Sequence, residues 1–190
     1  MTEPQPWTDA DLMARMGRGD AQALGCLVDR YKDAIVNYLT RLTGSRDRGE
    51  DVAQEAFLRL YQAAPRYRED GRLAAYLYRI ATNLVRSEER RRRRFRLVSG
   101  LLAGGEPHHH APTGPTRLLR QEERAVLSRA LAELPLHFRV PVVLYAIESW
   151  TYEAIAEFLG VSLGTVKSRI HRGKERLRTR LAPYRHGGEA

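Results

Sequence analysis

The sequence predicts an all-α protein in which a flexible linker joins two small helical domains. Apolar residues recur at spacings of three and four along most of the chain, and we find no convincing strand alternation. The 190 residues, 43% of them hydrophobic, suffice for one medium domain or two small ones. Four Gly and three Pro between residues 99 and 115 cannot bury a core and predict a linker. We therefore expect domains at 8–95 and 118–183, with the linker at 96–117.

The first domain is expected to contain four helices. Thr8 is the expected N-cap of the first, because its hydroxyl can accept from an unpaired amide of the first turn. A long helix then runs to Gly44, which ends it. Further helices are predicted over about 48–62 and from about 73 into the arginines at 90–94, with a loop between Pro65 and Gly71 separating them.

The second domain is expected to open with a helix near residue 118, whose apolar stripe is formed by Leu127, Leu131 and Leu134. The next helix must accommodate Pro141. We expect that helix to begin near residue 137, because first-turn amides lack intrahelical partners and a proline is tolerated among them.

A helix-turn-helix is predicted in the last third of the chain. Thr151 can cap a short helix, Gly160 supplies the positive φ of a tight turn, and Ser162 can cap a second helix that ends near Leu181. This order of cap, helix, turn and cap is typical of the motif, whose second helix enters the DNA major groove. The alternative is an ordinary helical hairpin with a solvated basic face.

Positive charge is concentrated in two segments. The net charge is +9, with seven Arg against two Glu at residues 86–96 and eight Lys or Arg against two Glu at 161–190. The rest of the chain is slightly acidic. Two basic segments on a near-neutral background predict two contacts with nucleic acid, the alternative being two solvated helix faces.

Other functional classes find little support. Cys26 is the single cysteine, so no internal disulfide can form and a reducing, cytoplasmic compartment is expected. We predict no secretion signal, no membrane insertion, no cofactor and no catalytic residues, since nothing resembles a nucleophile–base pair or a phosphate-binding glycine loop. Three consecutive histidines at 108–110 can hold metal only weakly without a supporting Cys or carboxylate cluster, so no metal site is predicted.

Three segments, in order, resemble bacterial sigma factors of the sigma-70 family. They are DVAQEAFLRLY at 51–61, LYRIATNL at 77–84 running into the arginine cluster, and GTVKSRIHR at 164–172. The resemblance spans about residues 9–183 apart from the linker. The short form with two domains is similar to the extracytoplasmic-function group, which implies an alternative sigma factor that binds core RNA polymerase and directs promoter-specific initiation.

The resemblance also implies three sets of functional residues. The set that would dock on the clamp helices of the largest polymerase subunit is Asp51, Gln54, Glu55, Leu58 and Arg59. The set that would recognise and melt the −10 element is Tyr67, Tyr76, Asn83, Arg86, Arg90 and Arg91. The set that would read the −35 element from the recognition helix is Thr165, Lys167, Ser168, Arg169, His171, Arg172 and Arg176. Further partners implied are promoter DNA, the flap of the second-largest subunit and an anti-sigma factor.

The chain departs from the family pattern at a few positions. Tyr76 stands where the family usually has Trp, no acid lies at Ser87, and Glu106 is the single acid of the linker. Two other functions were weighed. A free-standing transcriptional regulator would bind duplex DNA tightly without polymerase, and a small basic nuclease or recombinase would need clustered acids or an activated Ser or Tyr.

Overall fold

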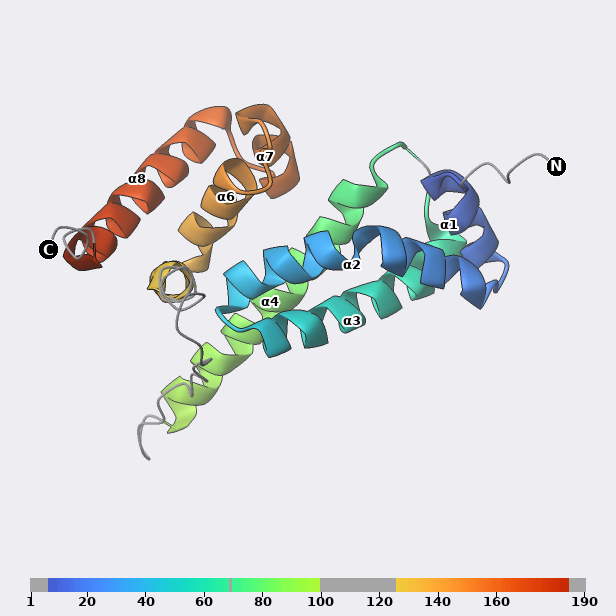
Figure 1. Cartoon of the computed structure of the whole chain (residues 1–190), viewed down its shortest axis with the longest axis horizontal. Coiled ribbons are helices and arrows are strands. Elements are labelled where there is room, and N and C mark those ends of the chain that lie inside the picture. The colour runs from blue at the N-terminus through green and yellow to red at the C-terminus, as the bar shows by residue number, and fades with distance from the viewer. Residues whose placement is uncertain (1–6, 69, 100–125, 185–190) are drawn as a thin grey trace, which may run out of the picture.

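Our computed structural model describes residues 7–68, 70–99 and 126–184, and every regular element in these ranges is a helix. The all-α prediction is therefore confirmed (Figure 1). The first domain contains α1 (Asp9–Gly17), α2 (Ala21–Thr43), α3 (Arg46–Ala63), the short 3₁₀ helix η1 (Ala64–Arg66) and α4 (Leu73–Ser99). In the second domain, residues 126–133 are helical and are followed by α6 (Leu136–Ala146), α7 (Tyr152–Leu159), α8 (Leu163–Leu181) and the 3₁₀ helix η2 (Ala182–Tyr184). The linker expected at 96–117 begins later than predicted, because α4 continues to Ser99. Its remaining residues and the histidines at 108–110 lie outside the described residues.

Local capping fixes where the first helices begin and end. The Thr8 hydroxyl accepts from the Asp11 amide at 3.2 Å, and the Asp11 carboxylate accepts from the Thr8 amide at 3.0 Å, which is a reciprocal capping box. Asp20 caps α2 by accepting from the Gln22 amide at 2.9 Å, a cap that the sequence analysis missed. Gly44 ends α2 with φ 75°, as predicted.

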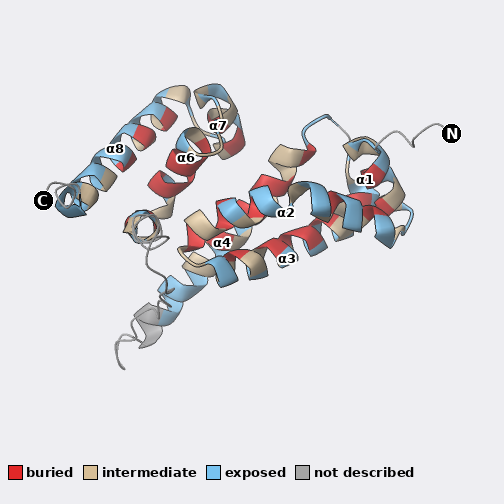
Figure 2. Ribbon diagram, in the orientation of Figure 1, coloured by how far each residue is buried: buried red, intermediate tan, exposed pale blue. Residues whose placement is uncertain are grey.

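The core of the first domain lies between α2, α3 and α4, and Figure 2 shows buried residues on the sides of α2 and α3 that face one another. Gly49 permits the close approach of these two helices, because a Cβ there would lie 2.8 Å from the Thr40 amide nitrogen. The Tyr38 ring is fully buried, and its hydroxyl shares a 2.7 Å hydrogen bond with Thr82. Burial raises the pKa of Tyr38.

The second domain packs α6 against α8. Gly173 is buried at this crossing, where a Cβ would lie 2.5 Å from Cγ2 of Val142. One expectation for this domain was wrong: Leu127 is 41% exposed rather than part of the apolar stripe. The predicted start of α6 near residue 137 is confirmed to within one residue, at Leu136. Pro141 nevertheless lies inside the helix, so α6 lacks the bond that residue 141 would donate to the carbonyl of residue 137.

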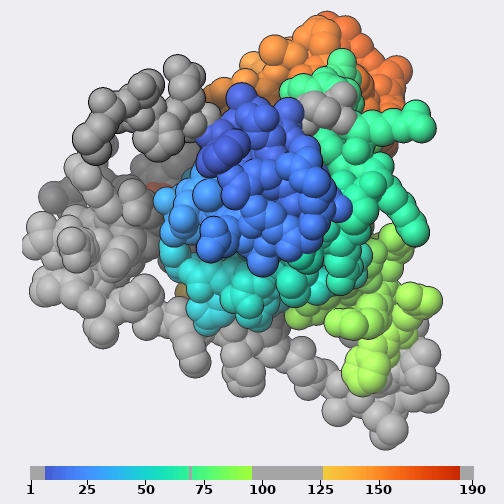
Figure 3. All heavy atoms as spheres, turned by 90° about the vertical axis from the view of Figure 1, so that its right-hand side faces the viewer, coloured from blue at the N-terminus to red at the C-terminus, as the bar shows by residue number. Residues whose placement is uncertain are grey.

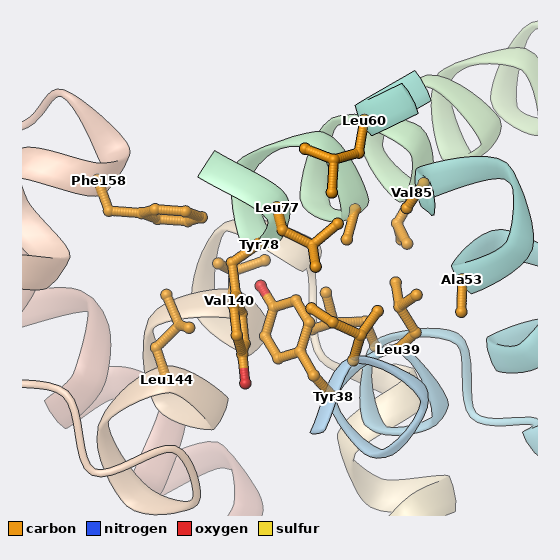
Figure 4. Close-up of a cluster of buried hydrophobic side chains, with 14 of the residues drawn as sticks. Tyr38, Leu39, Ala53, Leu60, Leu77, Tyr78, Val85, Val140, Leu144 and Phe158 are labelled. Atoms are coloured by element: carbon orange, nitrogen blue, oxygen red, sulfur yellow. The ribbon is translucent and has the colours of Figure 1, made fainter. Parts of the chain in front are cut away.

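The two domains share one hydrophobic cluster. Figure 4 shows Tyr38 and Tyr78 of the first domain beside Val140 and Leu144 of α6, with Phe158 of α7 reaching toward them. The Tyr78 and Trp150 rings lie with their centroids 5.4 Å apart. Seen from the side in Figure 3, the second domain rests directly on the first.

Candidate nucleic-acid and polymerase interfaces

The helix-turn-helix has the predicted caps. The Thr151 hydroxyl accepts from the Ala154 amide at 3.1 Å, Gly160 ends α7 with φ 64° and ψ 40°, and the Ser162 hydroxyl accepts from the Thr165 amide at 3.2 Å. These three positions fix both ends of the turn by short-range bonds. The motif therefore presents the first two turns of α8 in a defined direction.

Most of the residues predicted to read the −35 element are accessible on α8. Lys167, Ser168, His171 and Arg172 are exposed, and Thr165 is partly buried next to the Ser162 cap. His171 lies 3.3 Å from Glu175.

Two predicted −35 residues make additional contacts within the protein. Arg176 stacks over the Phe138 ring with its guanidinium carbon 4.7 Å from the centroid. Arg169 is half-buried and lines a cavity that opens between α8 and the first domain. Lys167 is exposed and lies with its Nζ 6.0 Å from the Tyr152 ring centroid, whereas no contact to another protein group is found for the exposed Arg172 in the described residues.

Three predicted −10 residues face the second domain. Asn83, Arg86 and Arg90 line a cavity of about 450 Å³ between α4 and the second domain, and Arg169 lies across it. Arg91 is exposed and lies outside this lining. In this arrangement three of the residues predicted to read the −10 element and one residue predicted to read the −35 element thus share a cavity.

The predicted −10 aromatics line a second cavity of about 870 Å³. Tyr67 and Tyr76 lie with their ring centroids 5.3 Å apart, so the expected pair of aromatic side chains does come together. Trp150 and Phe158 of the second domain form the opposite wall. A nucleotide base entering this cavity would therefore meet aromatic surfaces from both domains.

The predicted polymerase-docking residues share an exposed face of α3. Asp51, Gln54 and Leu58 are exposed, and the Leu58 side chain is 52% accessible. Arg59 donates from Nε to the Glu55 carboxylate at 2.7 Å, an exposed pair one helical turn apart. Leu58 and the charged and amide groups beside it therefore form a face of α3 that is accessible to a protein partner.

Polar contacts hold the two domains together, and the sequence analysis missed all of them. Arg139 of α6 is 6% exposed, donates to the carbonyls of Leu134 and Leu42, and lies 3.4 Å from Glu89 of α4. Burial lowers the pKa of Arg139, and the nearby carboxylate of Glu89 opposes that effect. The available signal was a single arginine inside the apolar run of residues 136–147.

Two further contacts cross between the domains. The Tyr78 hydroxyl donates to Glu148 at 2.6 Å, and burial together with this carboxylate raises the pKa of Tyr78. Arg72 pairs with Glu157 at an exposed position, so this pair contributes little stability. The arrangement of the domains therefore depends mainly on Arg139, Tyr78 and the shared apolar cluster.

Within the described ranges, no group of three or more His, Cys, Asp or Glu residues gathers where a metal ion would be held. No helix in those ranges is long and apolar enough to span a membrane.

Two family models match the chain at the two domains. Sigma-70 region 2 matches residues 27–95, and Sigma-70, region 4 matches residues 124–177. The SigE ECF RNA polymerase sigma factor of Mycolicibacterium smegmatis is 38% identical over 83% of this chain, which spans 61% of that protein. The SigW ECF factor of Bacillus subtilis is 34% identical over 86% of this chain and 91% of its own length.

Solved structures show the same fold. The sigma factor RpoE of Bartonella quintana, crystallised with the anti-sigma factor NepR, has a TM-score of 0.67 at 24% identity and covers 85% of this chain and 98% of its own. CnrH in complex with the cytosolic domain of CnrY has a TM-score of 0.65 at 23% identity, and the match covers 90% of this chain and 96% of CnrH.

The fold and the capped helix-turn-helix define a two-domain helical protein of the transcription machinery, a class of initiation factors rather than of enzymes. The chain belongs to the extracytoplasmic-function group of RNA polymerase sigma factors in the sigma-70 family, and acts as an alternative sigma factor in transcription initiation.

Proposed function

We propose that this sigma factor docks on core RNA polymerase through the exposed face of α3, opens the −10 element with α4 and reads the −35 element with α8. The observation that carries the proposal is the capped recognition helix, on which Lys167 and Arg172 are exposed. Its decisive experiment is run-off transcription with core polymerase over a library of randomised promoters. Enrichment of two short elements at a fixed spacing is expected, and transcription without sequence preference would contradict the proposal.

The docking step rests on the exposed Leu58 and the acids beside it. A basic helical partner, here the clamp helices of the largest polymerase subunit, would complement that charge. Replacing Asp51 and Glu55 by Lys should abolish co-purification with core polymerase, because the face of α3 would then repel a basic partner. Arg59 would also lose its ion pair with Glu55 and lie next to a lysine. The matched control replaces Asp29 and Asp33 of α2, which are also exposed acids, by Lys. Unchanged co-purification of the α3 variant would sink the docking assignment.

The −10 step uses the stacked tyrosines and the arginines of α4. Pulling a base out of the duplex costs a few kcal/mol, and stacking on aromatic rings recovers about 1–3 kcal/mol per base. Tyr67 and Tyr76 are suited to that stacking, while Arg86, Arg90 and Arg91 are suited to the phosphates. Because both cavities are shared with the second domain, promoter opening requires the domains to move apart.

The −35 step uses exposed groups of α8. Replacing Lys167 and Arg172 by Ala should reduce discrimination at the contacted base pairs by about 1–3 kcal/mol each. Transcription from −35 variants measures this loss, and equal wild-type transcription from scrambled −35 sequences would defeat the readout. Holoenzyme binding should also fall steeply as salt rises, since phosphate contacts release counterions.

Additional partners follow from the family. We propose contact of the second domain with the flap of the second-largest polymerase subunit, and sequestration of the chain by an anti-sigma factor, as in the named complexes with NepR and CnrY. A protein that initiates transcription at chromosomal promoters must act in the cytoplasm, so we propose that location. Tight promoter binding by the isolated chain, without polymerase, would favour a free-standing regulator instead.

A further inference from the structure

The 450 Å³ cavity between the domains has an unusual concentration of arginines. Arg86, Arg90 and Arg93 come from one side of α4, and Arg169 comes from α8. Glu89 is the single carboxylate in the described lining, and it already lies 3.4 Å from the buried Arg139. The cavity therefore carries a surplus of positive charge.

Nothing in the described part of the chain neutralises these arginines. None of the four forms an ion pair there, and Arg90 donates only to the Ser87 hydroxyl at 3.4 Å. The field is felt by His137 in the same lining, whose pKa is lowered by burial and then by Arg169, Arg176 and Arg93. Like charges from two domains thus face one another across a cavity, which opposes their approach.

We propose that this cavity binds a compact polyphosphate anion, such as the phosphate chain of a nucleotide, and that the bound anion bridges the two domains. Guanidinium forks match phosphate oxygens with paired hydrogen bonds, and Asn83 adds an amide donor at the same wall. The volume lies within the range of about 300–1,000 Å³ typical of small-molecule sites. An anion with several charges would offset the repulsion among these arginines and so further stabilise the packed arrangement of the two domains.

Nucleic acid has the same phosphate chemistry, so the two sources must be told apart. Asn83, Arg86 and Arg90 are also the residues proposed to meet the −10 element, and a polyphosphate held there would compete with promoter DNA. The cavity forms only while the domains are together, however, whereas strand binding requires them apart. A bridging anion and a DNA strand therefore have opposite effects on the separation of the domains.

Calorimetric titration of the full chain with tripolyphosphate tests the site. We expect saturable binding of one anion per chain. Arg93→Gln with Arg169→Gln, one residue from each wall, should weaken it by about tenfold or more. Arg94→Gln with Arg178→Gln is the matched control, because it makes the same charge change on the same helices at exposed positions outside the lining. Absence of saturable binding, or equal weakening in both variants, would overturn the proposal.

Energy transfer between two dyes, one on each domain, measures how far apart the domains lie when an anion is bound. The measurement uses neither polymerase nor promoter, so its result does not depend on the proposed function. Cys26 is exposed and is the single cysteine, and Thr179→Cys adds an exposed site on α8. Tripolyphosphate should raise the transfer efficiency by bringing the domains together, while a single-stranded 12-mer, about the length of one promoter element, should lower it. A fall with both ligands would show that the arginines serve strand binding alone and would refute the bridging site.

Discussion

Arg139 is the side chain whose removal should most directly separate the two domains. Its guanidinium donates to the Leu134 carbonyl at 2.6 and 3.2 Å, to the carbonyls of Leu42 and Ala132, and lies 3.4 Å from Glu89. Met at this position keeps most of the aliphatic stem but donates no hydrogen bond. We therefore expect Arg139→Met to leave carbonyls of both domains without their donor.

The expected loss in the free energy of unfolding follows from the burial of these hydrogen bonds. Each buried acceptor that loses its partner costs about 1–3 kcal/mol, and two of the three carbonyls are in buried pairs. Part of this cost is offset because the variant no longer buries a charge, and the lowered pKa of Arg139 shows that burial disfavours that charge. We expect a net loss of about 2–4 kcal/mol in the free energy of unfolding.

Urea unfolding followed by circular dichroism measures that loss, and the dye pair at Cys26 and Thr179→Cys reports the separation of the domains. Arg129→Met is the control, because Arg129 is exposed in the same domain and should cost little. The expected result for Arg139→Met is lower energy transfer with helical content retained below the unfolding transition. A loss under about 1 kcal/mol with unchanged transfer would refute the reasoning that buried hydrogen bonds of Arg139 hold the domains together.

Further predictions concern α8 and the cavity. Gly173→Ala should destabilise the second domain by about 1–2 kcal/mol, since overpacking outweighs the gain in helix propensity. Gly164→Ala should not, because a Cβ there would make only an ordinary 4.0 Å contact with the Ser162 hydroxyl oxygen. Val142→Ala should rescue the Gly173 variant in thermal unfolding. Arg169→Gln should raise the pKa of His137 in a histidine NMR titration, and an unchanged midpoint would contradict the assigned field. Because the folded-state pKa of His137 lies below its ordinary 6.5, its contribution to stability is present above about pH 6.5 and is lost as pH falls, which unfolding at several pH values measures.

Local rules predicted the secondary structure well. The caps at Thr8, Thr151 and Ser162 bond to amides three residues away, so the residues within one turn contain the information. Gly160 was predictable for the same reason, because a positive φ favours glycine. Asp20 was equally local and was overlooked. The start of α6 was predicted to within one residue, but the tolerance of Pro141 in the helix interior was not a local matter, because the buried α6 is held by its packing against α8.

By itself, the sequence determined the helical class, the helix-turn-helix and the exposed polar face of α3, because all three follow from periodicity and short-range bonds. Only the tertiary structure decided how the two surfaces predicted to read DNA face each other. The Tyr78–Glu148 bond joins residues 70 positions apart, and the Arg139–Leu42 bond joins residues 97 positions apart. No local pattern specifies such pairs, since they form only when helices of separate domains bury their apolar sides against one another.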